Sequence, residues 1–177
     1  GGATLRQGAQ FGSQTAMSEL TLRPAECSDA LEIARVQYES AQAATREAGQ
    51  AAVTWRDEST RQAIWQQRIA NHPCQTLVAT EGGAITGLVF WQLLRPGYAL
   101  LKSLYVHPYF WHRKIGHRLY RQALTDMRLE GVHRVELWVN AGNRRAERFY
   151  LREGLRYDQQ TKVLSGQLRQ RHMYGPI

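Results

Sequence analysis

The chain contains little cysteine, no long apolar run and fewer acidic than basic residues. Its two cysteines, Cys27 and Cys74, stand alone, without a C-x-x-C pair or the Cys/His spacing of a zinc site. Isolated thiols of this kind indicate reduced cysteines in the cytosol, and we expect neither a disulfide framework nor a metal site. No apolar stretch approaches the ~20 residues that a membrane-spanning helix needs, so we expect a cytoplasmic protein without a membrane segment.

A chain of 177 residues, of which 43% are hydrophobic and 10% aromatic, is long and apolar enough to form one domain with its own core. Its 23 basic residues outnumber the 15 acidic ones, which gives a net charge of +8. This excess favours a polyanionic ligand, and nucleic acid is one such ligand. The basic residues are scattered along the chain, however, and no nucleic-acid-binding motif is present. A nucleic-acid partner is therefore not expected.

Residues 1–16 (GGATLRQGAQFGSQTA) follow neither helical nor strand periodicity, and they lack the basic-then-apolar build of a signal peptide. We expect this segment to be a leader or a disordered tail. The folded domain would then span residues 17–177, starting at Met17.

Hydrophobic spacing and turn residues predict the order of the regular elements. After a short strand at residues 20–23, Asp29 and Glu32 have the spacing of a capping box and open a first helix. Ser59 or Thr60 caps a second helix. The other elements follow in order: strands at residues 76–80, 84–94 and 98–106, a helix from near 116 to about 129, a strand at 133–139, a helix at 143–150, and paired strands at 155–162 and 168–174.

The most informative stretch is residues 104–119 (LYVHPYFWHRKIGHRL), in which a strand passes through a short basic loop into a helix. The first N–H groups of a helix have no partner within it, and the helix dipole favours negative charge there. His112, Arg113 and Lys114 add side-chain charge at this point, so a phosphate or pyrophosphate is the candidate ligand. The alternative is an ordinary strand-loop-helix unit with basic residues on its surface.

Two blocks of the sequence resemble the GNAT N-acetyltransferase superfamily. Residues 104–119 fit the pattern L-Y-V-x-P-x-x-x-x-x-x-[IV]-G-x-x-L of its acetyl-CoA loop, in the form of a bacterial branch that carries a tryptophan, here Trp111. Only the last of that branch's loop glycines, Gly116, is present. Residues 135–154 (VELWVNAGNRRAERFYLREG) resemble the strand that precedes the family's N-x-x-A-x-x-F-Y-x-x-x-G helix.

The resemblance implies an α/β (α+β) fold: a single domain with a mixed, mostly antiparallel sheet of about seven strands, splayed at the cofactor site and flanked by about four helices. It also implies an enzyme, an acetyl-CoA-dependent N-acetyltransferase that moves the acetyl group directly to a primary amine of a small molecule or peptide, without a metal. The alternative is a non-catalytic acyl-CoA-binding or regulatory domain on the same fold. Such domains often pair, so the resemblance is also compatible with a homodimer.

The family pattern further implies which residues form the site. The backbone N–H of Val106 would donate to the thioester oxygen, and Tyr150 would act as the general acid toward the coenzyme A thiolate. Packing under the sheet is the alternative interpretation of Tyr150, and helix capping explains Asn143 equally well. The residues expected to bind the cofactor are Leu104, Tyr105, Val106, Trp111, His112, Arg113, Lys114, Ile115, Gly116, His117, Asn143, Ala146, Phe149 and Tyr150.

Two departures from the family pattern matter for the chemistry. His112 and Lys114 replace family glycines, so their side chains are strained if those positions need a positive φ. Family members often carry a glutamate at the position of Leu100, yet the strand at residues 98–106 has no carboxylate. The base is therefore open between water, a histidine and a carboxylate of the first two helices. The histidines are His107 and His172, and the carboxylates, for which surface charge is the alternative, are Glu39, Glu47, Asp57 and Glu58.

Overall fold

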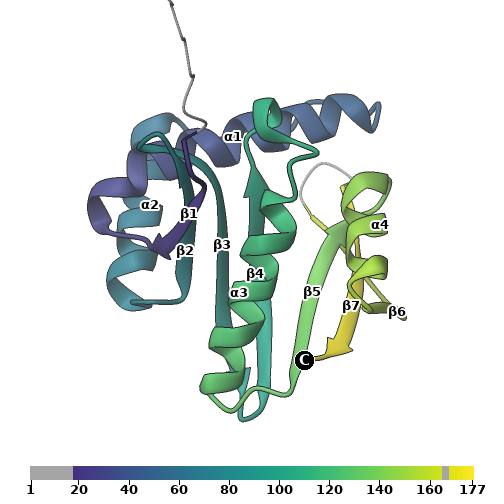
Figure 1. The fold of residues 1–177 in the computed structure, drawn as a ribbon. Coiled ribbons are helices and arrows are strands. Elements are labelled where there is room, and N and C mark those ends of the chain that lie inside the picture. The colour runs from purple at the N-terminus through teal and green to yellow at the C-terminus, as the bar shows by residue number, and fades with distance from the viewer. Residues whose placement is uncertain (1–17, 165–167) are drawn as a thin grey trace, which may run out of the picture.

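The computed structural model describes residues 18–164 and 168–177, so the predicted leader at residues 1–16 lies outside the described residues. Four α-helices and seven strands make up the described chain (Figure 1). Two short 3-10 turns, η1 (Cys27–Asp29) and η2 (Pro108–Phe110), precede α1 and α3. The other elements are β1 (Thr21–Pro24), α1 (Ala30–Glu47), α2 (Glu58–Asn71), β2 (Thr76–Glu81), β3 (Ala84–Arg95), β4 (Tyr98–Val106), α3 (Ile115–Leu129), β5 (Arg134–Asn140), α4 (Arg144–Arg152), β6 (Arg156–Val163) and β7 (Arg169–Pro176).

The seven strands form one mixed sheet in the order β1-β2-β3-β4-β5-β7-β6. All neighbours are antiparallel except β4 and β5, which run parallel. The expected fold class, a mostly antiparallel sheet of seven strands with four helices, is thereby confirmed. The last two strands pair as expected, but β7 lies between β5 and β6, a placement that strand patterning alone did not indicate.

The sheet parts between β4 and β5. These strands pair only from Tyr98 with Arg134 to Leu101 with Leu137, although β4 continues to Val106 and β5 to Asn140. In Figure 1 the two strands lie together at the lower end of the view, near the C-terminus, and separate toward the top. Because the paired segment is so short, the upper half of β4 presents its free edge to the gap.

Helices cover both faces of the sheet. One buried cluster joins α3 and α4 to one face, and includes Leu119, Met127 and Tyr150. A second cluster joins α1 and α2 to the other face, and includes Ile33, Trp65 and Phe90. Val135, Leu137 and Val139 are all buried on the α3 side, as their alternation in the sequence predicts. Over residues 18–164 and 168–177, no helix has both the length and the apolar character needed to cross a bilayer.

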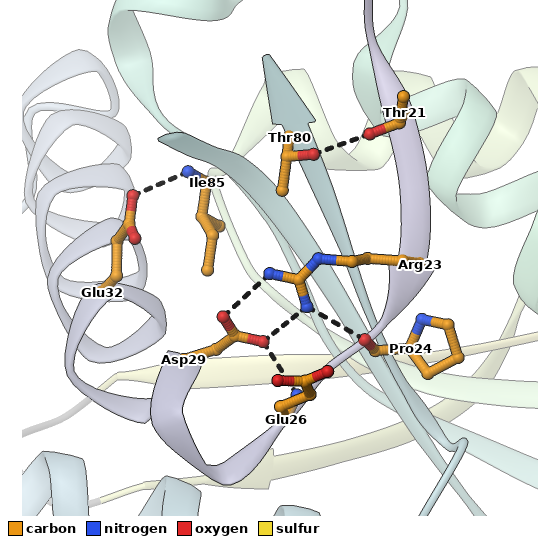
Figure 2. A network of polar contacts seen from close by, with 8 residues as sticks. All are labelled: Thr21, Arg23, Pro24, Glu26, Asp29, Glu32, Thr80 and Ile85. Carbon is orange, nitrogen blue, oxygen red and sulfur yellow. Dashed lines mark hydrogen bonds and ion pairs between the residues drawn. The ribbon is translucent and has the colours of Figure 1, made fainter. Parts of the chain in front are cut away.

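The predicted capping box of α1 is wrong. The Asp29 carboxylate instead pairs with the Arg23 guanidinium, at 2.7 and 2.9 Å, and accepts a hydrogen bond from the Glu26 N–H at 2.8 Å (Figure 2). Glu32 reaches to β3, where its Oε1 accepts from the Ile85 N–H at 2.7 Å. Asp29 therefore takes part in a capping box one turn earlier, with Glu26 at the start of η1, and Glu32 serves a tertiary contact with β3.

The cap of α2 also differs from the prediction. Asp57, rather than Ser59 or Thr60, is the capping residue, and its Oδ1 accepts from the Thr60 N–H at 2.8 Å. The Ser59 and Thr60 hydroxyls donate to the same carboxylate, at 2.6 and 2.8 Å. The Ser59 hydroxyl and the Thr60 N–H hold the pKa of Asp57 well below its ordinary value. A carboxylate can accept all three hydrogen bonds at once, which one hydroxyl cannot do.

Candidate active site

The loop before α3 forms a cradle of backbone N–H groups. His112 and Lys114 both have positive φ, 65° and 60°, so the strain expected from the missing glycines is present. The first backbone bond of α3 runs from the Arg118 N–H to the Lys114 carbonyl, at 3.0 Å. Among the described residues, no oxygen accepts from the N–H groups of residues 112–117. Successive free N–H groups in such a turn, at the positive end of a helix dipole, suit an anion.

The strain in this loop gives a testable prediction. Replacing Lys114 with glycine should raise the free energy of unfolding by up to about 1 kcal/mol. A left-handed conformation costs a residue with a side chain about 1–2 kcal/mol, and glycine avoids this cost. Part of the gain is lost because glycine makes the unfolded chain more flexible. Urea unfolding without ligand measures the change. Arg113→Gly is the control, since Arg113 lies between the two strained residues and does not have a positive φ. A Lys114→Gly protein no more stable than wild type would contradict the strain.

Two side chains of the loop and the first turn of α3 already have partners in the protein. The Arg113 guanidinium contacts the Glu81 carboxylate of β2 at 2.7 Å, and His117 Nδ1 lies 2.6 Å from the Glu153 carboxylate beyond α4. Ile115 is buried in the core, with 2% of its surface exposed. At Arg113, Ile115 and His117, therefore, the backbone N–H is the group that can meet a ligand, and Lys114 supplies an exposed side-chain charge.

Gly116 is the second residue of α3 and has an ordinary helical backbone, so its predicted role does not rest on a special φ. A Cβ placed there would have only Val106 Cγ2 nearby, at 3.6 Å, which is a normal van der Waals distance. The protein therefore has room for a side chain at this position. Because glycine has no side chain, a ligand can approach the free N–H groups at the start of the helix.

Val106 directs its backbone groups into the gap between β4 and β5. The N–H of the next residue, His107, donates to the Thr86 carbonyl of β3 at 2.9 Å. Successive residues of a strand alternate the edge toward which their amide groups point, so the Val106 N–H and C=O face the opposite edge. The Trp111 indole N–H donates to the Val106 carbonyl at 2.7 Å, from the gap side. The Val106 N–H therefore remains free to donate a hydrogen bond to a ligand in the gap.

The sequence did not predict a set of contacts that joins α1, α4 and Trp111. Arg145 of α4 stacks on the Trp111 ring, with its guanidinium carbon 3.8 Å from the ring centroid. The same guanidinium binds both oxygens of Glu47 on α1, at 3.0 and 2.9 Å, and lowers the pKa of that carboxyl. Gln50 Nε2 donates to the Ala141 carbonyl at 2.6 Å, which ties the segment after α1 to the same side. The end of α1 is thus linked to α4 over Trp111.

The second sequence block is arranged around Tyr150. Asn143 caps α4, since its Oδ1 accepts from the Ala146 N–H at 3.2 Å, while its amide nitrogen stays available as a donor. Phe149 and Tyr150 pack against Tyr120 of α3, with ring centroids 5.7 and 6.2 Å apart. Burial raises the pKa of Tyr150, and the nearby phenols of Tyr120 and Tyr105 raise it further. The Tyr150 hydroxyl therefore stays protonated and can act as a hydrogen-bond donor.

The two histidines named as bases both have carboxylate partners in the protein. His107 Nε2 pairs with Glu39 Oε2, and its Nδ1 accepts from the Tyr109 N–H at 3.2 Å. His172 Nδ1 lies 2.6 Å from Asp158 Oδ2, and its Nε2 lies 3.4 Å from Glu136 Oε2. His107 therefore has no ring nitrogen left for a substrate, and His172 has only 6% of its surface exposed, which hinders its access to one. An unforeseen carboxylate, Glu136 of β5, lies in register with Leu100, the position where the family often has glutamate.

The parted sheet, the N–H cradle beside it and the tyrosine of α4 together match the pattern expected of an acetyltransferase. The chain belongs to the acetyltransferase (GNAT) family, whose family model matches residues 32–155, more than half of the chain. A search of curated proteins gives no match.

Solved structures of this fold resemble the chain over nearly its whole length. Ard1 from Thermoplasma volcanium has a TM-score of 0.72 and 19% identity, over 89% of this chain and 97% of that one. The PaiA N-acetyltransferase from Thermoplasma acidophilum, in complex with coenzyme A, has a TM-score of 0.71 and 19% identity, over 90% and 99%. YncA from Salmonella typhimurium, with its cofactor acetyl-CoA, has a TM-score of 0.68 and 22% identity, over 90% and 94%. At these identities, the likeness shows the fold.

Proposed function

We propose that the protein is an acetyl-CoA-dependent N-acetyltransferase that transfers the acetyl group to a primary amine. One observation carries the proposal: the free N–H groups of residues 112–117 lie at the head of α3, beside a sheet that parts next to Val106. A ligand with a pyrophosphate and an extended amide-containing arm suits this combination. The phosphates would meet the N–H groups, and the arm would follow the free edge of β4.

The residues present fit acetyl-CoA, which would supply the activated acetyl group when bound. The Val106 N–H faces the gap and would donate to the thioester oxygen, where negative charge develops. Tyr150 would donate a hydrogen bond to the departing sulfur. Its pKa is raised, so the phenol is neutral and competent as a donor throughout the working pH range. PaiA with coenzyme A and YncA with acetyl-CoA, both of this fold, support the choice of cofactor.

Acetyl-CoA should therefore stabilise the folded protein. At a concentration 100-fold above its dissociation constant, a ligand adds about 2.7 kcal/mol, which for a domain of this size raises the melting temperature by about 5–10 °C. Thermal melts and calorimetric titration measure the effect, and thiol release with a panel of primary amines tests the transfer. No melting shift and no calorimetric signal at millimolar acetyl-CoA would contradict the proposed cofactor. Binding without thiol release from any amine would favour a non-catalytic acyl-CoA-binding domain.

A further inference from the structure

A pocket of about 460 Å³ lies between α1 and the turn that follows β4. Its walls come from Tyr38, Glu39, Gln42 and Arg46 of α1, and from His107 and Pro108. His107 directly follows Val106, the residue whose amide faces the gap in the sheet. The pocket is thus next to the proposed reaction site, and none of the residues expected to bind the cofactor lines it.

Glu39 is the carboxylate of the first two helices that lines this pocket. It is one of the four carboxylates that the sequence left open as a base or as a surface charge. The other three have partners elsewhere: Glu47 pairs with Arg145, Asp57 caps α2 through the Thr60 N–H, and Glu58 pairs with Arg35. Contacts within the protein thus explain the positions of the other three carboxylates, whereas Glu39 lies in the pocket beside the proposed reaction site.

His107 holds Glu39 in a defined orientation. Because His107 Nδ1 accepts the Tyr109 N–H, the ring proton of the neutral imidazole must lie on Nε2, which then donates to Glu39 Oε2. This tautomer leaves His107 as a positioning residue rather than a base. Glu39 Oε1 has no hydrogen-bond partner among the described residues. With half of its side chain exposed, Glu39 can bind a ligand cation through Oε1.

Arg46 adds the opposite charge to the same pocket. It lies seven residues after Glu39, about 10 Å along the helix axis, and Gln42 lies between them. Long side chains can bring the two charged groups closer together than their Cα atoms. No carboxylate within residues 18–164 or 168–177 forms an ion pair with Arg46. A pocket with one oriented carboxylate and one unpaired guanidinium complements a ligand that carries both an ammonium and a carboxylate group.

We propose that this pocket holds the acceptor and that the acceptor is a free amino acid. Glu39 binds its ammonium group, and Arg46 binds its carboxylate. The assignment of the pocket as an acceptor site rests on the proposed acetyltransferase function. The assignment of the ligand class rests on the two charges alone.

The transfer balances with these residues. The bound ammonium gives one proton to water, while Glu39 stays ionised and holds the nitrogen in place. The nitrogen then forms its bond to the acetyl carbon with its lone pair, and the carbon–sulfur bond breaks. The sulfur leaves with the electron pair of that bond and takes up the second nitrogen proton, which gives an amide and a thiol. Because Glu39 ends the reaction ionised, it is ready for the next acceptor.

The test compares matched acceptors and matched variants. The twenty amino acids are screened for thiol release with acetyl-CoA. Each active one is then compared with its amide and with its decarboxylated amine, which keep the ammonium group but lack the carboxylate. For wild type, kcat/KM should be about 10–100-fold higher for the amino acid, the usual range for one charge-assisted contact. Arg46→Gln should lower kcat/KM for the amino acid to about the value for the amine, and so remove this preference. Glu39→Gln should raise KM for both kinds of acceptor.

Controls and a binding assay keep this result separate from the proposed function. Glu58→Gln and Arg35→Gln change equally exposed charges of the same helix pair outside the pocket, and should leave the acceptor preference unchanged. Calorimetric titration of the same amino acids into the protein without acetyl-CoA measures the pocket directly, even if no transfer occurs. Failure of acetyl-CoA binding with intact amino-acid binding would contradict only the proposed function. Equal affinity for amino acid and amine, or a loss in Arg46→Gln that is the same for both, would overturn the pocket's assignment.

Discussion

Replacing Gly116 with valine is expected to weaken coenzyme A binding by at least about 30-fold while the protein stays folded. The new side chain would stand over the first N–H groups of α3, where the phosphates are proposed to approach. Each charge-assisted hydrogen bond that is lost costs about 1.5–3 kcal/mol, or roughly 10–100-fold in affinity. Calorimetric titration with coenzyme A measures the change, and urea unfolding measures stability.

Stability should not fall in this variant, because a Cβ at residue 116 meets only Val106 Cγ2 at an ordinary distance and glycine is a poor helix former. Gly116→Ala should even stabilise the protein, by up to about 1 kcal/mol, and still weaken binding. Thr125→Val is the control, since it places the same side chain at an exposed position further along α3. Unchanged affinity in a folded Gly116→Val protein would show that the pyrophosphate binds elsewhere.

Replacing Tyr150 with phenylalanine should lower kcat about 100-fold, with a range up to about 10⁴-fold, and leave coenzyme A affinity nearly unchanged. The substitution keeps the ring contacts with Phe149 and Tyr120 and removes only the hydroxyl. A hydrogen bond made mainly as the sulfur departs affects the chemical step rather than binding. Single-turnover kinetics with one accepted amine, together with a coenzyme A titration, separates the two effects.

Tyr120→Phe is the matched control from the same aromatic cluster. The Tyr120 hydroxyl is buried and has no hydrogen-bond partner among the described residues, so its removal should leave activity intact and stability equal or higher. A Tyr150→Phe enzyme with unchanged kcat, when chemistry is rate-limiting, would exclude Tyr150 from the reaction. An equal loss of activity in Tyr120→Phe would instead indicate a general effect on packing.

The pH profile should follow the amine rather than the enzyme. Burial raises the pKa of Tyr150, so its protonated form persists beyond the ordinary phenol range and it should not lose its proton as the pH approaches 9. Both candidate histidines are engaged by protein partners, and the acceptor ammonium gives its proton to water. The rate, measured as kcat/KM, should therefore rise with pH toward the pKa of the amine. A plateau already reached at pH 6.5 would contradict this and would require an enzyme base with a pKa below that value.

Local patterns in the sequence predicted most of the helices and strands. Helix spacing placed α3, and alternation placed Val135, Leu137 and Val139 on one buried face of β5. Gly131 and Gly154 follow α3 and α4 with positive φ values of 75° and 89°, a local feature typical of glycine after a helix. These features depend on residues a few positions apart, so a single sequence carries the information for them.

The candidate site was predictable where it follows one continuous stretch of chain. The loop from Trp111 to Gly116, its positive φ values and the cap at Asn143 are all local, and the sequence indicated each of them. The same sequence predicted a capping box at Asp29 and Glu32. This failed because a 3-10 turn begins earlier, so that Asp29 forms its capping box with Glu26, while Glu32 accepts from the Ile85 N–H of β3.

The sequence by itself determined the order of the helices and strands. Its resemblance to a family also predicted an acetyl-CoA loop. Only the tertiary structure decided that β7 lies between β5 and β6 and that β4 and β5 part after four paired residues. It also brought together Glu39 with His107, 68 positions apart, and Glu47 with Arg145, 98 positions apart. Such pairs have no local signature, because the distance between two side chains on separate elements is set by how the whole sheet and its helices pack.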